Sequence, residues 1–253
     1  MNRKLKVIAL IPARYAATRF PGKLMSLLDG KTVIRRVYES ALAVNLFDDI
    51  IVVTDSNLIY NEITSFGGKA MMSVREHICG SDRIAEAAEH FPDVDIIVNV
   101  QGDEPFLERE ALEKLLSVFS EFGNESIDLA SLMQRIDLPN QIDNPNVVKV
   151  VVDRQCRALL FSRSRIPFPR DPLGVIYYRH IGIYAFRRSA LIDFYHTPVT
   201  PLEEAERIEC LRYLESGKKI KMVEVLGTGI GIDTPQDLIE AEKYIEFVKR
   251  EGV

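Results

Sequence analysis

Short apolar runs alternate with amphipathic segments along the first half of the chain. Runs typical of buried strands fall at residues 7–11, 49–54, 69–73 and 95–100. Segments with apolar residues at helical spacing fall at 32–43, 57–66 and 108–119. This alternation, with short connections, predicts an α/β fold whose mostly parallel sheet is covered by helices on both faces.

The pattern loosens beyond about residue 125. Strands are predicted at 128–134, 146–152, 157–162 and 175–186, then one helix at 202–216, closed by Gly217. We interpret this region, roughly 135–216, as a mixed α+β lobe inserted into a single domain spanning 1–253. Such a lobe would supply acceptor recognition, a subunit interface or both. A strand at 219–226 and a last helix, with Thr234 as its N-cap and Pro235 as its first residue, complete the chain.

The first strand opens into a cationic loop. Pro12 cannot donate to a sheet ladder, so the strand should end there, and Arg14, Arg19 and Lys23 follow. A basic loop at the carboxyl end of a parallel strand predicts an anion site, because guanidinium and ammonium groups both bind phosphate. The alternative is a solvated basic loop that binds nothing.

A second polar segment lies at residues 79–83. Ser81 is predicted to cap a helix that begins there, with Asp82 in its first turn. The exposed amides of that helix start, together with Arg83, could contact a nucleotide. A cap with no ligand is the simpler interpretation.

Two aspartates are candidate metal ligands. Asp103 follows Gly102 at the end of the run at 95–100, and Asp233 lies just before the last helix. Carboxylates suit a hard divalent cation, although an Asp at a strand end is also a common turn former. The glycines at 227–231 do not have the G-x-G-x-x-G spacing and do not follow the first strand, which argues against a dinucleotide-binding dehydrogenase.

Composition, net charge and cysteine spacing disfavour several classes of function. The chain has 253 residues, 47% of them apolar, and a formal net charge of −5, which disfavours a nucleic-acid binder that works through bulk charge. No apolar run approaches the ~20 residues of a membrane span, so no membrane insertion is expected. The three widely spaced cysteines fit neither a zinc pattern nor a disulfide framework, which favours a cytoplasmic protein.

The ordered set of motifs resembles the 3-deoxy-manno-octulosonate cytidylyltransferase (CMP-Kdo synthetase) family. The segments that carry this resemblance are 11–23, 79–83, 99–105, 161–163, 179–186, 201–206 and 231–238. The resemblance implies a nucleotide-diphospho-sugar transferase type of fold. It also implies magnesium-dependent transfer from CTP to Kdo, giving CMP-Kdo and pyrophosphate. The implied setting is lipopolysaccharide biosynthesis by a cytoplasmic homodimer.

The resemblance also implies residue roles. Lys23, Arg14 and Asp103 would be catalytic, and Asp103 and Asp233 would hold Mg²⁺. The other implied contacts are, for the nucleotide, Ala13, Arg14, Arg19, Lys23, Ser81 and Arg83, and, for the sugar, Gln101, Arg163, His180, Tyr184 and Glu209.

One residue departs from the family pattern. Cys210 stands where the family usually has Gln, and a thiol is a weaker hydrogen-bond donor than an amide. This departure leaves the exact acceptor open, with 8-amino-Kdo or another 2-keto sugar acid as alternatives to Kdo. Two further alternatives do not depend on Cys210: a cytidylyltransferase for a nine-carbon sugar acid such as sialic acid, and a non-catalytic nucleotide-binding protein on the same fold.

Overall fold

The computed structural model describes residues 4–16, 20–77, 79–121, 123–171, 174–227 and 229–251. The chain forms two compact units, one built from 1–109 and 228–253 and the other from 110–227. Each is described by itself below. The single domain with an inserted lobe at 135–216 stays a prediction.

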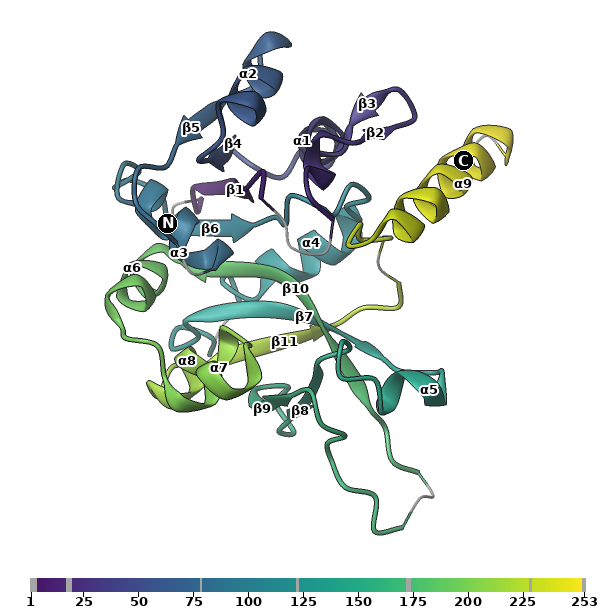
Figure 1. Cartoon of the computed structure of the whole chain (residues 1–253). Helices are drawn as coiled ribbons and strands as arrows, with labels where there is room; N and C mark the ends of the chain where they lie inside the picture. Colours follow the sequence, from purple (N-terminus) through teal and green to yellow (C-terminus); the bar gives the residue numbers. More distant parts are fainter. Residues whose placement is uncertain are drawn as a thin grey trace. The chain divides into compact units, whose positions relative to one another are not determined.

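The first unit contains a four-stranded parallel sheet in the order β6-β1-β4-β5 (Figure 1). Its elements are β1 (Val7–Ala13), the 3-10 helix η1 (Lys23–Met25), β2 (Leu27–Leu28), β3 (Lys31–Thr32), α1 (Val33–Ala43), β4 (Asp49–Thr54), α2 (Asn57–Ser65), β5 (Ala70–Met72), α3 (Gly80–Ala88), β6 (Ile96–Asn99) and α9 (Pro235–Glu251). The predicted α/β class with a mostly parallel sheet is confirmed.

Sheet and helices form for reasons visible in the sequence. Strands β1, β4 and β6 are almost wholly buried, as expected for strands covered on both faces. Helix α1 is capped by the Thr32 hydroxyl, which accepts a hydrogen bond from the Arg35 amide.

The chain changes direction across the sheet at β1. Helices α1 and α2 connect β1 to β4 and β4 to β5, whereas α3 leads from β5 back to β6 on the other side of β1. Because parallel crossovers are right-handed, α3 lies on the opposite face from α1 and α2. The carboxyl ends of β1 and β6 therefore flank a topological switch point, where ligands bind in folds of this type.

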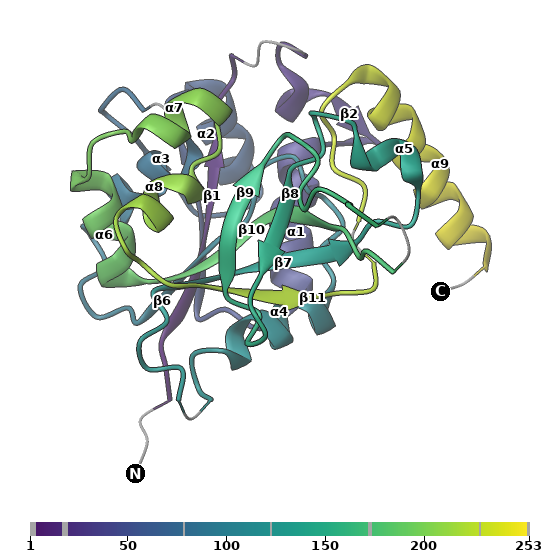
Figure 2. The ribbon, with the colours of Figure 1, turned by 90° about the horizontal axis from the view of Figure 1, so that it is seen from below.

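The second unit is a mixed sheet with helices. Its elements are α4 (Arg109–Ser117, which begins at the last residue of the first unit's 1–109 segment), β7 (Leu129–Arg135), α5 (Pro139–Ile142), β8 (Lys149–Val152), β9 (Ala158–Ser162), β10 (Tyr178–Arg187), α6 (Arg188–His196), α7 (Pro201–Glu206), α8 (Cys210–Glu215) and β11 (Ile220–Glu224). Strand β10 pairs antiparallel with β7 and β8, and β11 runs parallel to β7. Figure 2 shows α6, α7 and α8 gathered at one end of β9 and β10.

One predicted feature of this unit is wrong, and two of its helices, α5 and α6, were not predicted. The single helix at 202–216 is two helices, because Arg207 adopts a left-handed conformation (φ 55°) and its amide closes α7 onto the Glu203 carbonyl. Helix α6 was not predicted. It begins directly at the end of β10, and no glycine or proline separates the two elements.

Candidate active site

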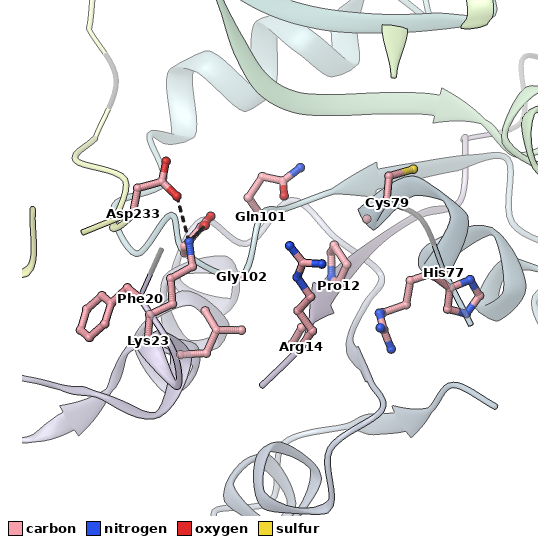
Figure 3. A pocket seen from close by; sticks show the side chains of 14 residues that line it. Pro12, Arg14, Phe20, Lys23, His77, Cys79, Gln101, Gly102 and Asp233 are labelled. Carbon is pink, nitrogen blue, oxygen red and sulfur yellow. Dashed lines mark hydrogen bonds and ion pairs between the residues drawn. The ribbon is translucent and has the colours of Figure 1, made fainter. Parts of the chain in front are cut away.

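A cavity of about 270 Å³ opens at the switch point of the first unit (Figure 3). Its wall is made from the end of β1, η1, the start of α3, the loop after β6 and the segment before α9. The lining residues are Pro12, Ala13, Arg14, Phe20, Lys23, Leu24, His77, Cys79, Gly80, Arg83, Gln101, Gly102, Asp103 and Asp233. Seven of the thirteen residues predicted to form the site therefore line one cavity: Ala13, Arg14, Lys23, Arg83, Gln101, Asp103 and Asp233.

Close backbone approach builds the floor of this cavity. A Cβ at Gly102 would lie 2.9 Å from the Pro12 carbonyl oxygen, so only glycine lets the chain after β6 pass this close to the end of β1. The contact brings Asp103 next to the cationic loop that follows β1.

Lys23 bridges the two candidate metal ligands. Its Nζ donates to Asp103 Oδ2 and, at 3.0 Å, to Asp233 Oδ1. Burial alone would lower the pKa of the Lys23 ammonium, but the two carboxylates outweigh burial and raise the pKa above its ordinary value. Lys23 is therefore a cation at neutral pH.

Backbone hydrogen bonds hold the two aspartates in place. The Ile232 amide donates to the Asp103 carbonyl at 2.9 Å, which ties the two segments together next to their acidic side chains. The Asp233 and Thr234 amides donate to Asp237 Oδ2 at 3.0 and 2.7 Å, which caps the first turn of α9. The predicted cap at Thr234 is confirmed, because its hydroxyl accepts from the Asp237 amide.

The other cations of the cavity are held differently. Arg14 is exposed at the end of β1, and Figure 3 shows its side chain between Lys23 and His77. The Arg83 guanidinium is buried in the wall, where it pairs with Asp55 at 2.7 Å and donates to Ser73 Oγ. Arg19 lies outside the described residues.

The prediction that Ser81 caps α3 is wrong. Cys79 occupies the N-cap position and makes no side-chain capping bond, whereas Ser81 lies inside the helix and is fully buried. Its hydroxyl is 3.5 Å from Asn99 Nδ2 on β6. The helix begins two residues earlier than a cap at Ser81 would imply, because Gly80 is already helical.

His77 lines the cavity but was not predicted. Its Nε2 lies 2.7 Å from Glu86 Oε2 on α3, and Glu86 also accepts from the Val74 and Arg75 amides. Burial tends to raise the pKa of Glu86, but these hydrogen bonds outweigh it and lower the pKa. His77 could not be predicted, since a lone histidine nine residues from a glutamate matches no motif.

Three residues of interest meet in the second unit. His180 and Tyr184 lie on β10 on either side of a bulge, with ring centroids 5.4 Å apart. The Tyr184 hydroxyl is hydrogen-bonded to the Cys210 thiol at the start of α8. Burial first, and Glu209 after it, raises the pKa of that thiol, so it remains protonated. Cys210 thus contacts a residue predicted to bind the sugar.

His180 is a neutral imidazole at physiological pH. Its Nε2 lies 3.0 Å from Ser131 Oγ, and its ring packs edge-on against Phe161. Although the residue keeps partial exposure, desolvation of the ring lowers the pKa of His180 to about 4.

Arg163 is engaged by the backbone of its own unit. Its guanidinium donates to the carbonyls of Glu206 at 2.7 Å, Pro145 at 2.9 Å and Arg207 at 3.4 Å. The buried Lys149 ammonium donates to the Arg163 carbonyl at 2.5 Å. In this arrangement Arg163 connects the segment at Pro145 to the end of α7. Glu209 lies beside this region, half-buried at the N-cap of α8.

The described residues contain no cluster of three or more histidine, cysteine, aspartate or glutamate side chains that could enclose a metal ion. Inside the cavity, Asp103 and Asp233 converge on one cation, the Lys23 ammonium, and so are the pair that fits a divalent ion with few protein ligands. Within the same residues no helix is long and apolar enough to cross a bilayer.

A family model and several named proteins are similar to this chain. The family model described as Cytidylyltransferase matches residues 8–220. The chain is 61% identical over 245 residues to the 3-deoxy-manno-octulosonate cytidylyltransferase of Flavobacterium johnsoniae, covering 96% of this chain and 100% of that one. It is 58% identical over 243 residues to the protein of the same name from Christiangramia forsetii, covering 96% and 98%.

Solved structures are also similar. A CMP:2-keto-3-deoxy-manno-octonic acid synthetase complexed with CTP matches with a TM-score of 0.90 at 38% identity, over 96% of this chain and 99% of that one. A 4-diphosphocytidyl-2C-methyl-D-erythritol synthase from Anaerococcus prevotii matches with a TM-score of 0.64 at 16% identity, which shows the shared fold alone. With a family model that matches most of its length and relatives near 60% identity, the chain belongs to the cytidylyltransferase family, among the 3-deoxy-manno-octulosonate cytidylyltransferases.

Proposed function

We propose that this protein transfers CMP from CTP to Kdo, giving CMP-Kdo and pyrophosphate. One observation from the structure carries the proposal: Arg14, Lys23, Asp103 and Asp233 line a single cavity at the switch point of a parallel sheet. These are the residue types that bind a triphosphate and its metal ion. The two relatives at 61% and 58% identity, named for this reaction, support Kdo as the acceptor.

The chemistry assigns roles to the cations. The anomeric hydroxyl of the sugar attacks the α-phosphorus in line, and pyrophosphate leaves. Negative charge develops on the phosphoryl oxygens and on the leaving group, where Lys23 and Arg14 would stabilise it. Ala13 and Arg83 line the same cavity. We propose that these two residues, together with Ser81, which is buried in α3, form the part of the site that binds the nucleotide.

Magnesium is proposed as the cofactor, held by Asp103 and Asp233. When bound, the ion would neutralise phosphate charge and orient the triphosphate. Two carboxylates suit an ion that keeps several waters and phosphate oxygens as its remaining ligands. The convergence of both side chains on one ammonium in the first unit supports this assignment.

The sugar would be held by hydrogen bonds. We propose Gln101, His180, Tyr184 and Glu209 as contacts, and Arg163 as a residue that orders the neighbouring loops. A histidine with a pKa of about 4 is poorly matched to general-base work near neutral pH. We therefore propose that His180 forms hydrogen bonds to the acceptor and is not its base.

The cellular setting belongs to the same proposal. We propose a cytoplasmic homodimer that serves lipopolysaccharide synthesis. The three cysteines are free in the structure, which fits a reducing compartment.

Pyrophosphate release from CTP and Mg²⁺ tests the acceptor. Kdo, 8-amino-Kdo and sialic acid would be offered separately, and we expect release with Kdo. Release with 8-amino-Kdo alone would keep the mechanism and assign Cys210 to the choice of acceptor. Release with sialic acid alone, or with none of the three, would contradict the proposed function.

A further inference from the structure

The ammonium of Lys23 lies where a metal ion would be expected. Its Nζ contacts one carboxylate oxygen each from Asp103 and Asp233. The three residues come from η1, the loop after β6 and the segment before α9, and Figure 3 shows Lys23 pointing into this junction. The Lys23 side chain is only 13% exposed, whereas those of Asp103 and Asp233 are 28% and 49% exposed.

The carboxylates are brought together by the backbone and not by Lys23. The hydrogen bond from the Ile232 amide to the Asp103 carbonyl joins their two segments, and Asp237 fixes the amides of Asp233 and Thr234. Without a cation between them, the two negative side chains would repel each other. Lys23 therefore balances the charge of two carboxylates whose positions the backbone already fixes.

A metal ion bound between Asp103 Oδ2 and Asp233 Oδ1 would occupy the place of this ammonium. Mg²⁺ binds carboxylate oxygens at about 2.0–2.1 Å, closer than an ammonium approaches, and both are cations. Binding of the ion to these two oxygens therefore requires Lys23 to leave. A triphosphate offers the ammonium another anionic partner in the same cavity, which Arg14 also lines.

We propose that Lys23 closes the metal site until the nucleotide binds. The ammonium holds Asp103 and Asp233 while the cavity contains no triphosphate, and moves to the phosphates when CTP enters. The two aspartates are thereby released to the metal ion that accompanies CTP. This exchange rests on the proposed function, and it makes metal binding conditional on the nucleotide.

Binding of Mn²⁺ without nucleotide tests the exchange. Mn²⁺ prefers the same oxygen ligands as Mg²⁺, and its free concentration is read directly by electron paramagnetic resonance. The unaltered protein and Lys23→Gln would be titrated with Mn²⁺ alone. We expect at least a tenfold lower Kd for Lys23→Gln, because removing the ammonium leaves the carboxylate pair uncompensated.

Three variants serve as controls. Lys69→Gln removes a lysine that pairs with Asp49 at 2.8 Å outside the cavity, so it matches the change in net charge and should leave the Kd unchanged. Lys23→Arg keeps the positive charge and should bind Mn²⁺ as weakly as the unaltered protein. The double variant with Lys23→Gln and Asp103→Asn should lose the gained affinity.

The inference is overturned if Lys23→Gln binds Mn²⁺ no more tightly than the unaltered protein. Thermal unfolding of each variant, with and without Mn²⁺, checks that the fold is intact. If Lys23→Gln does not fold, the same titration with Lys23→Met decides the question. Failure of the proposed function would be distinct, because the unaltered protein would then make no CMP-Kdo, whatever the metal affinities of the variants.

Discussion

In the proposed mechanism, the Lys23 ammonium stabilises the negative charge that develops on the phosphates. We expect Lys23→Ala to lower kcat/KM by a factor equivalent to about 2.7–4 kcal/mol, as for loss of one donor to a developing oxyanion. The physical reason is that the ammonium stabilises charge that grows on the phosphates during transfer. Steady-state kinetics with CTP and Kdo would measure it, and a near-normal kcat/KM would remove Lys23 from the mechanism.

The His180 imidazole links stability to pH. Its pKa is about 4 in the folded protein, against an ordinary value of 6.5. Above pH 6.5 the imidazole is mostly neutral in both the folded and the unfolded protein. Below pH 6.5 the imidazole becomes protonated in the unfolded chain before it does so in the folded protein, which favours unfolding. Stability should therefore fall between pH 6.5 and pH 4, by up to about 2 kcal/mol on going from pH 7.5 to pH 5.

Urea unfolding at those two pH values checks this expectation. The His180→Gln variant serves as the control, because it keeps a polar side chain but cannot titrate. The unaltered protein should lose about 2 kcal/mol more than the variant. Equal losses would show that His180 does not carry this pH dependence.

Individual site residues differed in how well the sequence predicted them. Lys23, Asp103 and Asp233 were predicted from strand ends and a helix start, and all three line one cavity. Their mutual hydrogen bonds were not predictable, because the residues are separated by up to 210 positions in the sequence. The hydrogen bonds of Arg163 to three carbonyls were missed for a similar reason, since backbone acceptors leave no mark on side-chain composition.

At the scale of elements, α7 and α8 are joined by a buried ion pair. The Arg212 guanidinium donates to both Glu203 oxygens at 2.6 Å, and the two side chains are 3% and 8% exposed. Removing one partner would leave an uncompensated buried charge. We expect Glu203→Ala to lower the free energy of unfolding by about 3–5 kcal/mol.

A surface pair in the same unit provides the matched control. Lys218 and Asp193 lie 2.8 Å apart, and their side chains are 29% and 57% exposed, far more than those of the buried pair. Asp193→Ala should therefore cost no more than about 1 kcal/mol in the same urea unfolding experiment. If Glu203→Ala costs as little, the pair between α7 and α8 does not stabilise the fold.

The first turn of α9 depends on Asp237. Its carboxylate accepts from two amides and from the Thr234 hydroxyl at 2.9 Å. We expect Asp237→Ala to destabilise the helix start by about 1 kcal/mol and to speed amide hydrogen exchange there. Gln236→Ala, at an exposed neighbouring position, should leave that exchange unchanged. Unchanged exchange in Asp237→Ala as well would contradict the capping role.

The start or end of a helix was predictable from the sequence only where its signal is local. The Thr234 cap of α9 was predicted because capping chemistry is local. The break at Arg207 was missed because the apolar spacing continues through Ile208 and Leu211, both buried. A left-handed conformation at a non-glycine residue has no signal in that spacing.

The order of strands and helices along the chain determines the sheet of the first unit and the position of the cavity. Strict alternation through β6 fixed the parallel sheet of the first unit, and the reversal at β1 placed the cavity at the strand ends. The pairing of β10 between β7 and β8 could not be predicted, because antiparallel partners distant in sequence leave no periodic trace. Assignment of the acceptor therefore relies on family membership, while the location of the phosphate site follows from topology and charge.

In the proposed reaction the anomeric hydroxyl of Kdo attacks the α-phosphorus of CTP, and pyrophosphate leaves. Phosphorus NMR of the unaltered protein with CTP, Kdo and Mg²⁺ distinguishes this reaction from attack at another phosphorus. We predict one new phosphodiester signal, that of CMP-Kdo, rising in equal amount with pyrophosphate. Formation of CDP or inorganic phosphate in place of pyrophosphate, or persistence of CTP alone, would show that this reaction does not occur.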